Sequence, residues 1–293
     1  MKDSVRLLVY LLATVLLGAL LAPPLFWGAH ALIAHGVFTV LGRYDFETFF
    51  HRALLVAALI LIWPLIRSLE IRKLADLQLA PNPHRWRDLI AGVLLAAVPL
   101  VCCGAVLLAL PLFSIRTAIN WTAIAKLAAA AVFVPIIEEA FFRGLMLGAL
   151  LKTGRVFMSI FLTSFLYSIV HFLKAPDQTS PEVTWLSGFN SIAHAFVQFT
   201  DPLLVGAGLT TLFLIGWILA EARLLTRSLW LSIGLHAGWI FTAGAFNKIA
   251  LRQFIALPWL GKNLLVGLVP LGVAALTWLL MRGWLKYANA RET

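Results

Sequence analysis

Charged residues are scarce in this chain of 293 residues, of which only 12% are Asp, Glu, Lys or Arg. A soluble globular protein has about a quarter charged residues and about half apolar ones. Here 61% of the residues are apolar, and the mean hydropathy is +0.93. The apolar residues form runs long enough to cross a bilayer, so the composition argues against a soluble enzyme and predicts an integral membrane protein.

Cysteine is also nearly absent. Cys102 and Cys103 are the only two, and they are adjacent within an apolar run. Neighbouring residues in a helix do not easily bridge each other, so both are interpreted as small apolar side chains. They predict no disulfide framework and indicate no redox compartment.

Acidic residues are fewer than basic ones, 13 against 23, which leaves a net charge of +10. The basic residues flank the apolar runs, as membrane topology requires, so the charge predicts a lipid bilayer and not nucleic acid as the partner. With both termini in the cytoplasm, the cytoplasmic segments hold 14 of the 23 basic residues and the opposite side holds eight. This asymmetry favours that orientation.

The apolar runs predict an all-α fold, a polytopic bundle of about eight transmembrane helices that forms a single membrane domain over residues 1–293. Two further segments are expected not to span, namely 29–50, a connection with a short helix, and 177–200, which includes an interfacial helix. The predicted spans are 6–28, 51–69, 89–113, 121–149, 156–173, 202–222, 229–249 and 263–284.

Two adjacent carboxylates and an arginine interrupt the fourth predicted span, at Glu138, Glu139 and Arg143. An ionisable side chain deep in a membrane helix costs about 2.5–3.5 kcal/mol on insertion scales, so each one needs a reason. Glu139 and Arg143 are four residues apart, share a helical face and are expected to pair. Glu138 is rotated by about 100° and is expected to face another helix or a water molecule.

Two histidines lie in other predicted spans, His171 at the end of the fifth and His236 early in the seventh. A single membrane histidine is more often a packing residue, but two of them with an unpaired glutamate favour chemistry. Counted from the cytoplasmic ends of their helices, Glu138 and His171 lie about 21–24 Å deep and His236 only about 13 Å deep. The three depths therefore agree imperfectly.

The ordered set of Glu-Glu-x-x-x-Arg, an aromatic residue four positions before a histidine, and a later histidine resembles a known family. It is similar to the CPBP family (CAAX protease and bacteriocin-processing, Abi) of intramembrane proteases, which includes the type II CAAX prenyl endopeptidase. The resemblance covers residues from about 121 to 245. Together with the absence of a sorting motif, its bacterial character implies a bacterial inner membrane as the location. It implies an endopeptidase of glutamate or metallo type (EC 3.4 class) that hydrolyses a peptide bond in a membrane-associated peptide or protein.

Carried over onto this sequence, the resemblance implies a role for each motif residue. Glu138 would activate the hydrolytic water, and Glu139 with Arg143 would complete the motif and brace the site. His171 would help to hold the water or a metal, and His236 would stabilise the oxyanion or act as a ligand. The family is described both as metal-dependent and as metal-free, so zinc held by Glu138, His171 and His236 is a hypothesis.

Two positions depart from the family pattern. Tyr167 stands where the family usually has phenylalanine, which adds a hydroxyl group that needs a partner. Ile240 stands four residues after His236, where the family usually has Asn or Asp. If that side chain donated to the oxyanion, another donor must replace it, and Asn247 on the same face is about 16 Å away from His236.

Three hypotheses follow for function. The first is an intramembrane endopeptidase, whose substrate, prenylated or not, and oligomeric state the sequence leaves open. The second is a non-catalytic scaffold or bacteriocin-immunity partner that keeps the fold, which Ile240 favours. The third is a transporter or channel, against which stand the lack of repeated broken-helix segments and the clustering of charge in one motif.

Overall fold

A computed structural model describes residues 2–77, 79–172, 182–261 and 264–290 of the chain. The structure is 79% helical, which confirms the prediction of an all-α membrane bundle. Within the described residues the only sheet is a short antiparallel pair of strands, β1 (Phe113–Ile115) and β2 (Ala250–Arg252).

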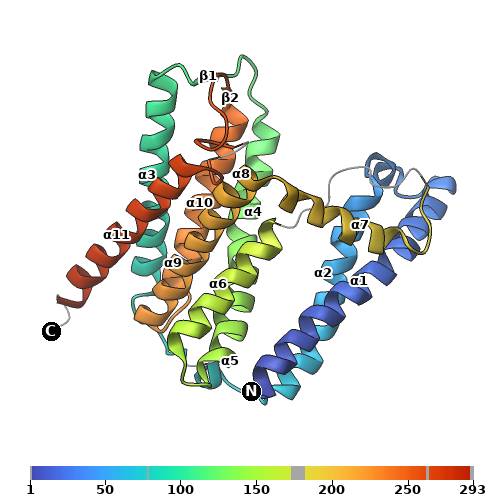
Figure 1. The fold of residues 1–293 in the computed structure, drawn as a ribbon, viewed down its shortest axis with the longest axis horizontal. Helices are drawn as coiled ribbons and strands as arrows, with labels where there is room; N and C mark the ends of the chain where they lie inside the picture. Colours follow the sequence, from blue (N-terminus) through green and yellow to red (C-terminus); the bar gives the residue numbers. More distant parts are fainter. Residues whose placement is uncertain (1, 78, 173–181, 262–263, 291–293) are drawn as a thin grey trace. The chain divides into compact units, whose positions relative to one another are not determined.

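Figure 1 shows the order of the helices along the chain. In chain order they are α1 (Lys2–Ala34), η1 (Thr39–Arg43), α2 (Phe46–Ser68), η2 (Leu74–Leu77), α3 (Arg85–Ala109), α4 (Trp121–Glu139), η3 (Ala140–Met146), α5 (Leu147–Leu151), α6 (Val156–Phe172), α7 (Ser187–Ala195), η4 (Phe196–Thr200), α8 (Pro202–Leu204), η5 (Val205–Leu209), α9 (Thr210–Thr226), α10 (Trp230–Ile249) and α11 (Leu268–Ala290). The elements labelled α are α-helices. Those labelled η are short, η1, η2 and η4 being 3-10 helices and η3 and η5 π-helices.

Each predicted span coincides with a helical stretch, but the stretches differ in length and hydropathy. Within the described ranges, five helices are long and apolar enough to cross a membrane, and Val156–His171 is a shorter apolar helix. The count of eight spans therefore stays a prediction.

The two segments expected not to span have different outcomes. The prediction for 29–50 was wrong at both ends, because α1 continues to Ala34 and α2 already begins at Phe46. Asp45 caps α2, since its carboxylate accepts the backbone N–H of Thr48 at 3.1 Å. In the segment 177–200, the described part contains α7 and η4, and residues 177–181 lie outside the described residues.

The chain divides into two compact units, residues 1–72 with 173–201 and residues 73–172 with 202–293. In the first, smaller unit α1 packs along α2, and α7 contacts α1. Small residues allow this close packing around the core residues Ala19, Ala22, Phe46, Phe50 and Ala53. The single-domain interpretation stays a prediction.

The larger unit, residues 73–172 and 202–293, is built around the contact between α3 and α10. A Cβ atom on Gly234 would overlap the backbone carbonyl oxygen of Leu89, so only glycine permits this approach of the two backbones. His236 comes two residues after Gly234, which rotates it by about 200° around the helix. The glycine contact therefore turns His236 away from α3, and α10 also packs against α4.

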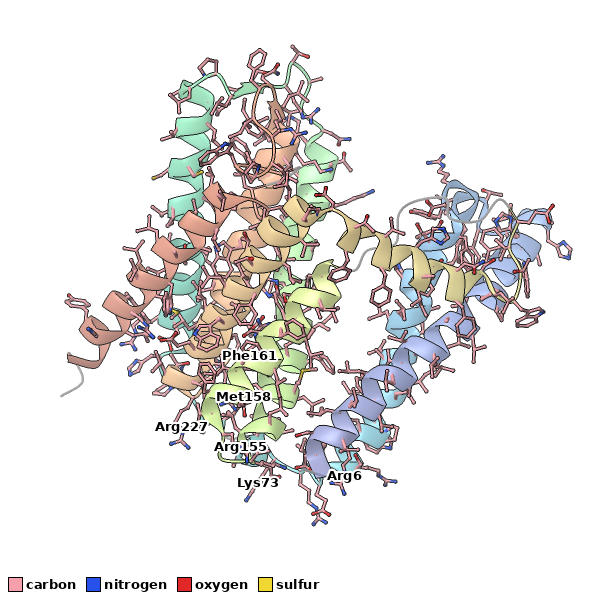
Figure 2. The ribbon with its side chains drawn as sticks, viewed as in Figure 1. Arg6, Lys73, Arg155, Met158, Phe161 and Arg227 are labelled. Atoms are coloured by element: carbon pink, nitrogen blue, oxygen red, sulfur yellow. The ribbon has the colours of Figure 1, made fainter. Side chains whose placement is uncertain are left out.

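Basic residues gather at one end of the larger unit, where Figure 2 shows Lys73, Arg155 and Arg227. The strands β1 and β2 lie at its opposite end (Figure 1). All three basic residues belong to segments that the sequence places in the cytoplasm. Their common end agrees with the predicted alternation of the spans, while the location of the termini stays a prediction.

Candidate active site

The two glutamates lie at a break in regular α-helix. Glu139 is the last residue of α4, and the π-helical segment η3 follows it at once. At the end of η3 the backbone N–H of Leu147 bonds to the carbonyl of Phe142, five residues back. Such π segments within helices frequently occur at functional sites.

Glu139 and Arg143 form the buried part of the site. Arg143 Nη1 donates to Glu139 Oε1 at 3.0 Å, and both side chains are 0% exposed. The pair expected from the four-residue spacing is therefore present. Arg143 Nη2 also donates to the backbone carbonyl of Gly216 on α9, at 3.1 Å. Sequence reasoning missed Gly216, because a backbone carbonyl has no sequence signature.

His236 joins this pair from α10. Its Nδ1 lies 2.9 Å from Glu139 Oε1, the same oxygen that accepts Arg143. A carboxylate only accepts, so Nδ1 carries the hydrogen, and the neutral ring then has its lone pair on Nε2. Glu139 thereby sets the tautomer of His236 and the direction of its Nε2.

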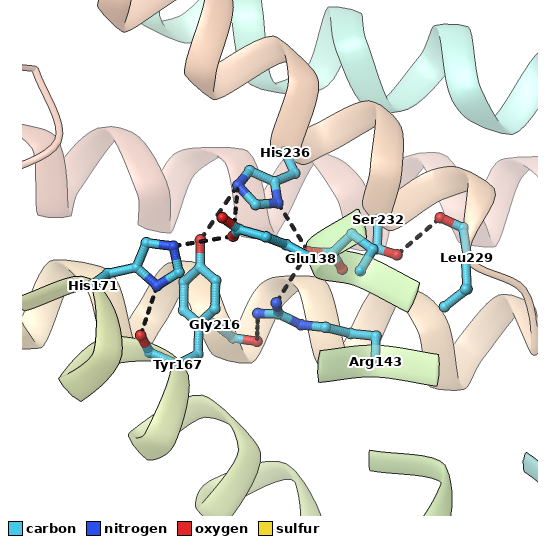
Figure 3. A network of polar contacts seen from close by, with 9 residues as sticks. Glu138, Arg143, Tyr167, His171, Gly216, Leu229, Ser232 and His236 are labelled. Atoms are coloured by element: carbon cyan, nitrogen blue, oxygen red, sulfur yellow. Dashed lines mark hydrogen bonds and ion pairs between the residues drawn. The ribbon is translucent and has the colours of Figure 1, made fainter. Parts of the chain in front are cut away.

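Glu138 faces the other side chains of the site, as Figure 3 shows. Its Oε2 lies 3.0 Å from His171 Nε2 and 3.8 Å from His236 Nε2. The side chains of Glu138 and His171 are each 27% exposed. This carboxylate therefore forms the accessible part of the cluster, and it meets both histidines expected from the sequence.

The ring of His171 is oriented by its own helix. Its Nδ1 donates to the backbone carbonyl of Tyr167, one turn earlier in α6, at 2.8 Å. In the neutral ring, Nε2 then carries a lone pair and no hydrogen. The ionised Glu138 carboxylate that faces it has no hydrogen either. The 3.0 Å contact between them must therefore hold one proton, on the imidazole or on the carboxyl group.

A zinc ion was the expected alternative, and the donor types suit one. Zinc binds imidazole nitrogen and carboxylate oxygen, and both histidines donate their other ring nitrogen to an acceptor, as metal ligands usually do. In the described part of the chain, however, no group of three or more His, Cys, Asp or Glu side chains has the arrangement of a metal site. The types of the three residues therefore suit zinc, whereas their arrangement in this structure does not match a metal site.

Tyr167 completes the wall of the site. Its hydroxyl lies 3.5 Å from His236 Nε2, and the residue is 3% exposed. The Arg143 guanidinium carbon lies 4.2 Å from the centre of the Tyr167 ring. Ile240 is half-buried on α10, and its apolar side chain offers no hydrogen-bond donor to the site.

Residues 120–242 match the family model described as type II CAAX prenyl endopeptidase Rce1-like. The resemblance is confirmed. The matched segment, 123 of the 293 residues (242 − 120 + 1), extends from the residue before α4 into α10 and contains all five motif residues. It supports an intramembrane endopeptidase of the CAAX-protease type, and hence a hydrolase. No curated protein and no solved structure matches the chain.

Proposed function

We propose that this protein is an intramembrane endopeptidase that cleaves a membrane-associated peptide or protein with a water molecule activated by Glu138. One observation carries the proposal. The accessible Glu138 carboxylate and the Nε2 atoms of His171 and His236 converge beside a fully buried ion pair. Buried charge is costly in a membrane, and an arrangement with a proton to share is suited to acid–base catalysis.

The first step is the attack of water on the substrate carbonyl. In the reacting state the shared proton lies on His171 Nε2, and the ionised Glu138 carboxylate accepts one hydrogen of the water, whose oxygen lone pair points to the carbonyl carbon. The new C–O bond forms as Glu138 takes the proton. The carbonyl π electrons move to the carbonyl oxygen, which becomes the oxyanion of a tetrahedral intermediate.

The second step is the collapse of that intermediate. The oxyanion re-forms the C=O bond, the C–N bond breaks, and the proton held by Glu138 passes to the leaving amine. The products are a carboxylic acid, which keeps the second hydrogen of the water, and an amine, and Glu138 is ionised again. Glu139 and Arg143 take no proton in this scheme and position His236 against the reacting atoms.

Zinc remains part of the proposal as an alternative. Glu138, His171 and His236 would hold it, and it would act as a Lewis acid on the substrate carbonyl. In the two steps described above, the only protein groups that act are side chains, and no metal ion takes part.

The test is cleavage of membrane-anchored fluorogenic peptides, prenylated and unprenylated, by the purified full-length protein in detergent. Glu138→Ala is compared with Glu221→Ala, a matched change at another membrane carboxylate, which bonds Trp278 and Arg282 on α11. We expect wild type and Glu221→Ala to cleave and Glu138→Ala to lose cleavage by about 10²–10⁴-fold, the typical contribution of an acid–base group.

The outcomes separate the hypotheses. Equal cleavage by wild type and Glu138→Ala would remove the assigned role of Glu138. Silence of both on every peptide would favour the non-catalytic scaffold, which Ile240 also supports. Addition of a chelator, followed by zinc, decides whether a metal takes part.

A further inference from the structure

The hydroxyl of Tyr167 is a buried polar group in the centre of the site. In Figure 3 it lies beside the Glu138 carboxylate and points to the ring of His236. Its 3.5 Å distance from His236 Nε2 is at the outer limit for an O–H···N hydrogen bond, so the resting contact is weak. A weakly held O–H is free to turn towards a better acceptor.

The ring that carries this hydroxyl is held from three sides. The Arg143 guanidinium lies over it at 4.2 Å, and Phe142 meets it edge-on with ring centres 5.3 Å apart. The His171 ring lies 4.1 Å away, and the Tyr167 carbonyl accepts its Nδ1–H. These contacts restrict the orientation of the ring and thereby the position of the phenol oxygen.

The other polar groups around Glu138 are poor candidates for an oxyanion donor, and the proton that His171 Nε2 shares is engaged with Glu138 at 3.0 Å. Neutral His236 gives its hydrogen to Glu139, so the Nε2 that faces Glu138 can only accept. The Ser232 hydroxyl donates to the carbonyl of Leu229 at 2.9 Å. Arg143 is fully buried, with two of its nitrogens bonded to Glu139 and Gly216.

We propose that Tyr167 is a catalytic residue, whose hydroxyl donates a hydrogen bond to the oxyanion of the tetrahedral intermediate. The inference rests on the proposed endopeptidase function and adds a donor to it. As the water oxygen bonds to the carbonyl carbon, the Tyr167 O–H turns from His236 Nε2 to the oxyanion. No proton is transferred, and the hydrogen bond is released when the C=O bond re-forms.

The test is the Tyr167→Phe variant of the full-length protein, because phenylalanine keeps the ring and removes only the hydroxyl. We expect kcat to fall by about 10²–10³-fold with KM little changed, the pattern for loss of a donor used in the transition state. A peptidyl phosphonate, which mimics the tetrahedral oxyanion, should bind the variant weaker by a similar factor. The thermal midpoint in detergent should stay near that of wild type.

A second variant distinguishes a missing donor from general damage. Position 240 is one turn after His236 on the same helical face, so an amide there is within reach of the same region. We expect Ile240→Asn to restore part of the kcat of Tyr167→Phe and part of its phosphonate affinity.

Two results would overturn the inference. Tyr167→Phe with wild-type kcat and phosphonate affinity would do so even where Glu138→Ala is inactive, and the proposed function would then stand without this donor. Wild-type activity in both Tyr167→Phe and Glu138→Ala would overturn the inference and the proposed function together.

Discussion

Two clusters of charge lie within the helices of the larger unit, and they are built differently. In the cluster on α9 and α11, each oxygen of Glu221 accepts one donor, Oε2 from Trp278 Nε1 and Oε1 from Arg282 Nε, both at 2.7 Å. In the site, the Glu138 carboxylate faces the Nε2 atoms of two histidines. A structural carboxylate is matched with donors, whereas Glu138 faces two ring nitrogens and shares one proton with His171.

The same contrast separates the two adjacent glutamates of the site. Glu139 resembles Glu221, because it is buried and its Oε1 accepts from an arginine and from an N–H of His236. Glu138 is 27% exposed, and among the described residues it forms ion pairs with His171 and His236 and not with an arginine. This contrast supports the proposal that Glu138 carries the chemistry and that Glu139 has a positioning role.

The largest effect on stability is expected from Arg143→Met, which tests whether the inner pair is structural. Removing one partner of a buried ion pair leaves the other charge uncompensated and typically costs about 3–5 kcal/mol. We expect the free energy of unfolding, measured by denaturant titration in detergent micelles, to fall by that amount.

The matched control for this variant removes both charges. Glu139→Gln with Arg143→Met should recover much of the loss, because no unpaired charge remains. An unchanged midpoint in Arg143→Met alone would show that the inner pair contributes nothing to folding.

The local part of this site could be predicted from the sequence. The four-residue spacing of Glu139 and Arg143 predicts their pairing, because neighbours on one helical face lie close whatever the rest of the fold does. The same geometry leaves Glu138 without a partner on its own helix, and His171 meets it. Both expectations need only the dimensions of an α-helix.

The long-range part could not be predicted in the same way. Counted along its helix, His236 is about 8 Å shallower than Glu138, yet its Nε2 lies 3.8 Å from the Glu138 carboxylate. Such a count gives depth only where helix axes are parallel and regular, and η3 already departs from α-helical pitch. The Gly216 carbonyl was missed because every residue carries one. The first span was predicted to end at residue 28, although Ala29 and Ala31 favour helix and α1 continues to Ala34.

A smaller effect is expected from His171→Asn, which tests whether Nε2 of this ring has a catalytic role. An asparagine amide can still donate to the Tyr167 carbonyl as Nδ1 does, but it removes the nitrogen that faces Glu138. We expect kcat to fall by about 100-fold, the lower end for a group that takes part in proton transfer, while the thermal midpoint changes little.

His171→Gln is the companion variant, since its longer side chain places an amide near the position of Nε2. Recovery of kcat in His171→Gln relative to His171→Asn would support a role for a polar group at that point. Equal activity of wild type and His171→Asn would argue that the contact with Glu138 serves only packing.

The smallest effect is expected from Arg282→Met in the α9–α11 cluster. The Arg282 side chain is 50% exposed, and exposed ion pairs contribute about 0–1 kcal/mol to stability. Glu221 keeps the Trp278 N–H as a donor in the variant, so its carboxylate is not left unpaired. We expect a loss of less than about 1 kcal/mol in the same denaturant titration and no change in peptide cleavage. A loss of unfolding free energy as large as that of Arg143→Met would mean that exposure does not distinguish the two clusters. The division into a structural and a reactive cluster would then rest only on the proton shared by Glu138 and His171.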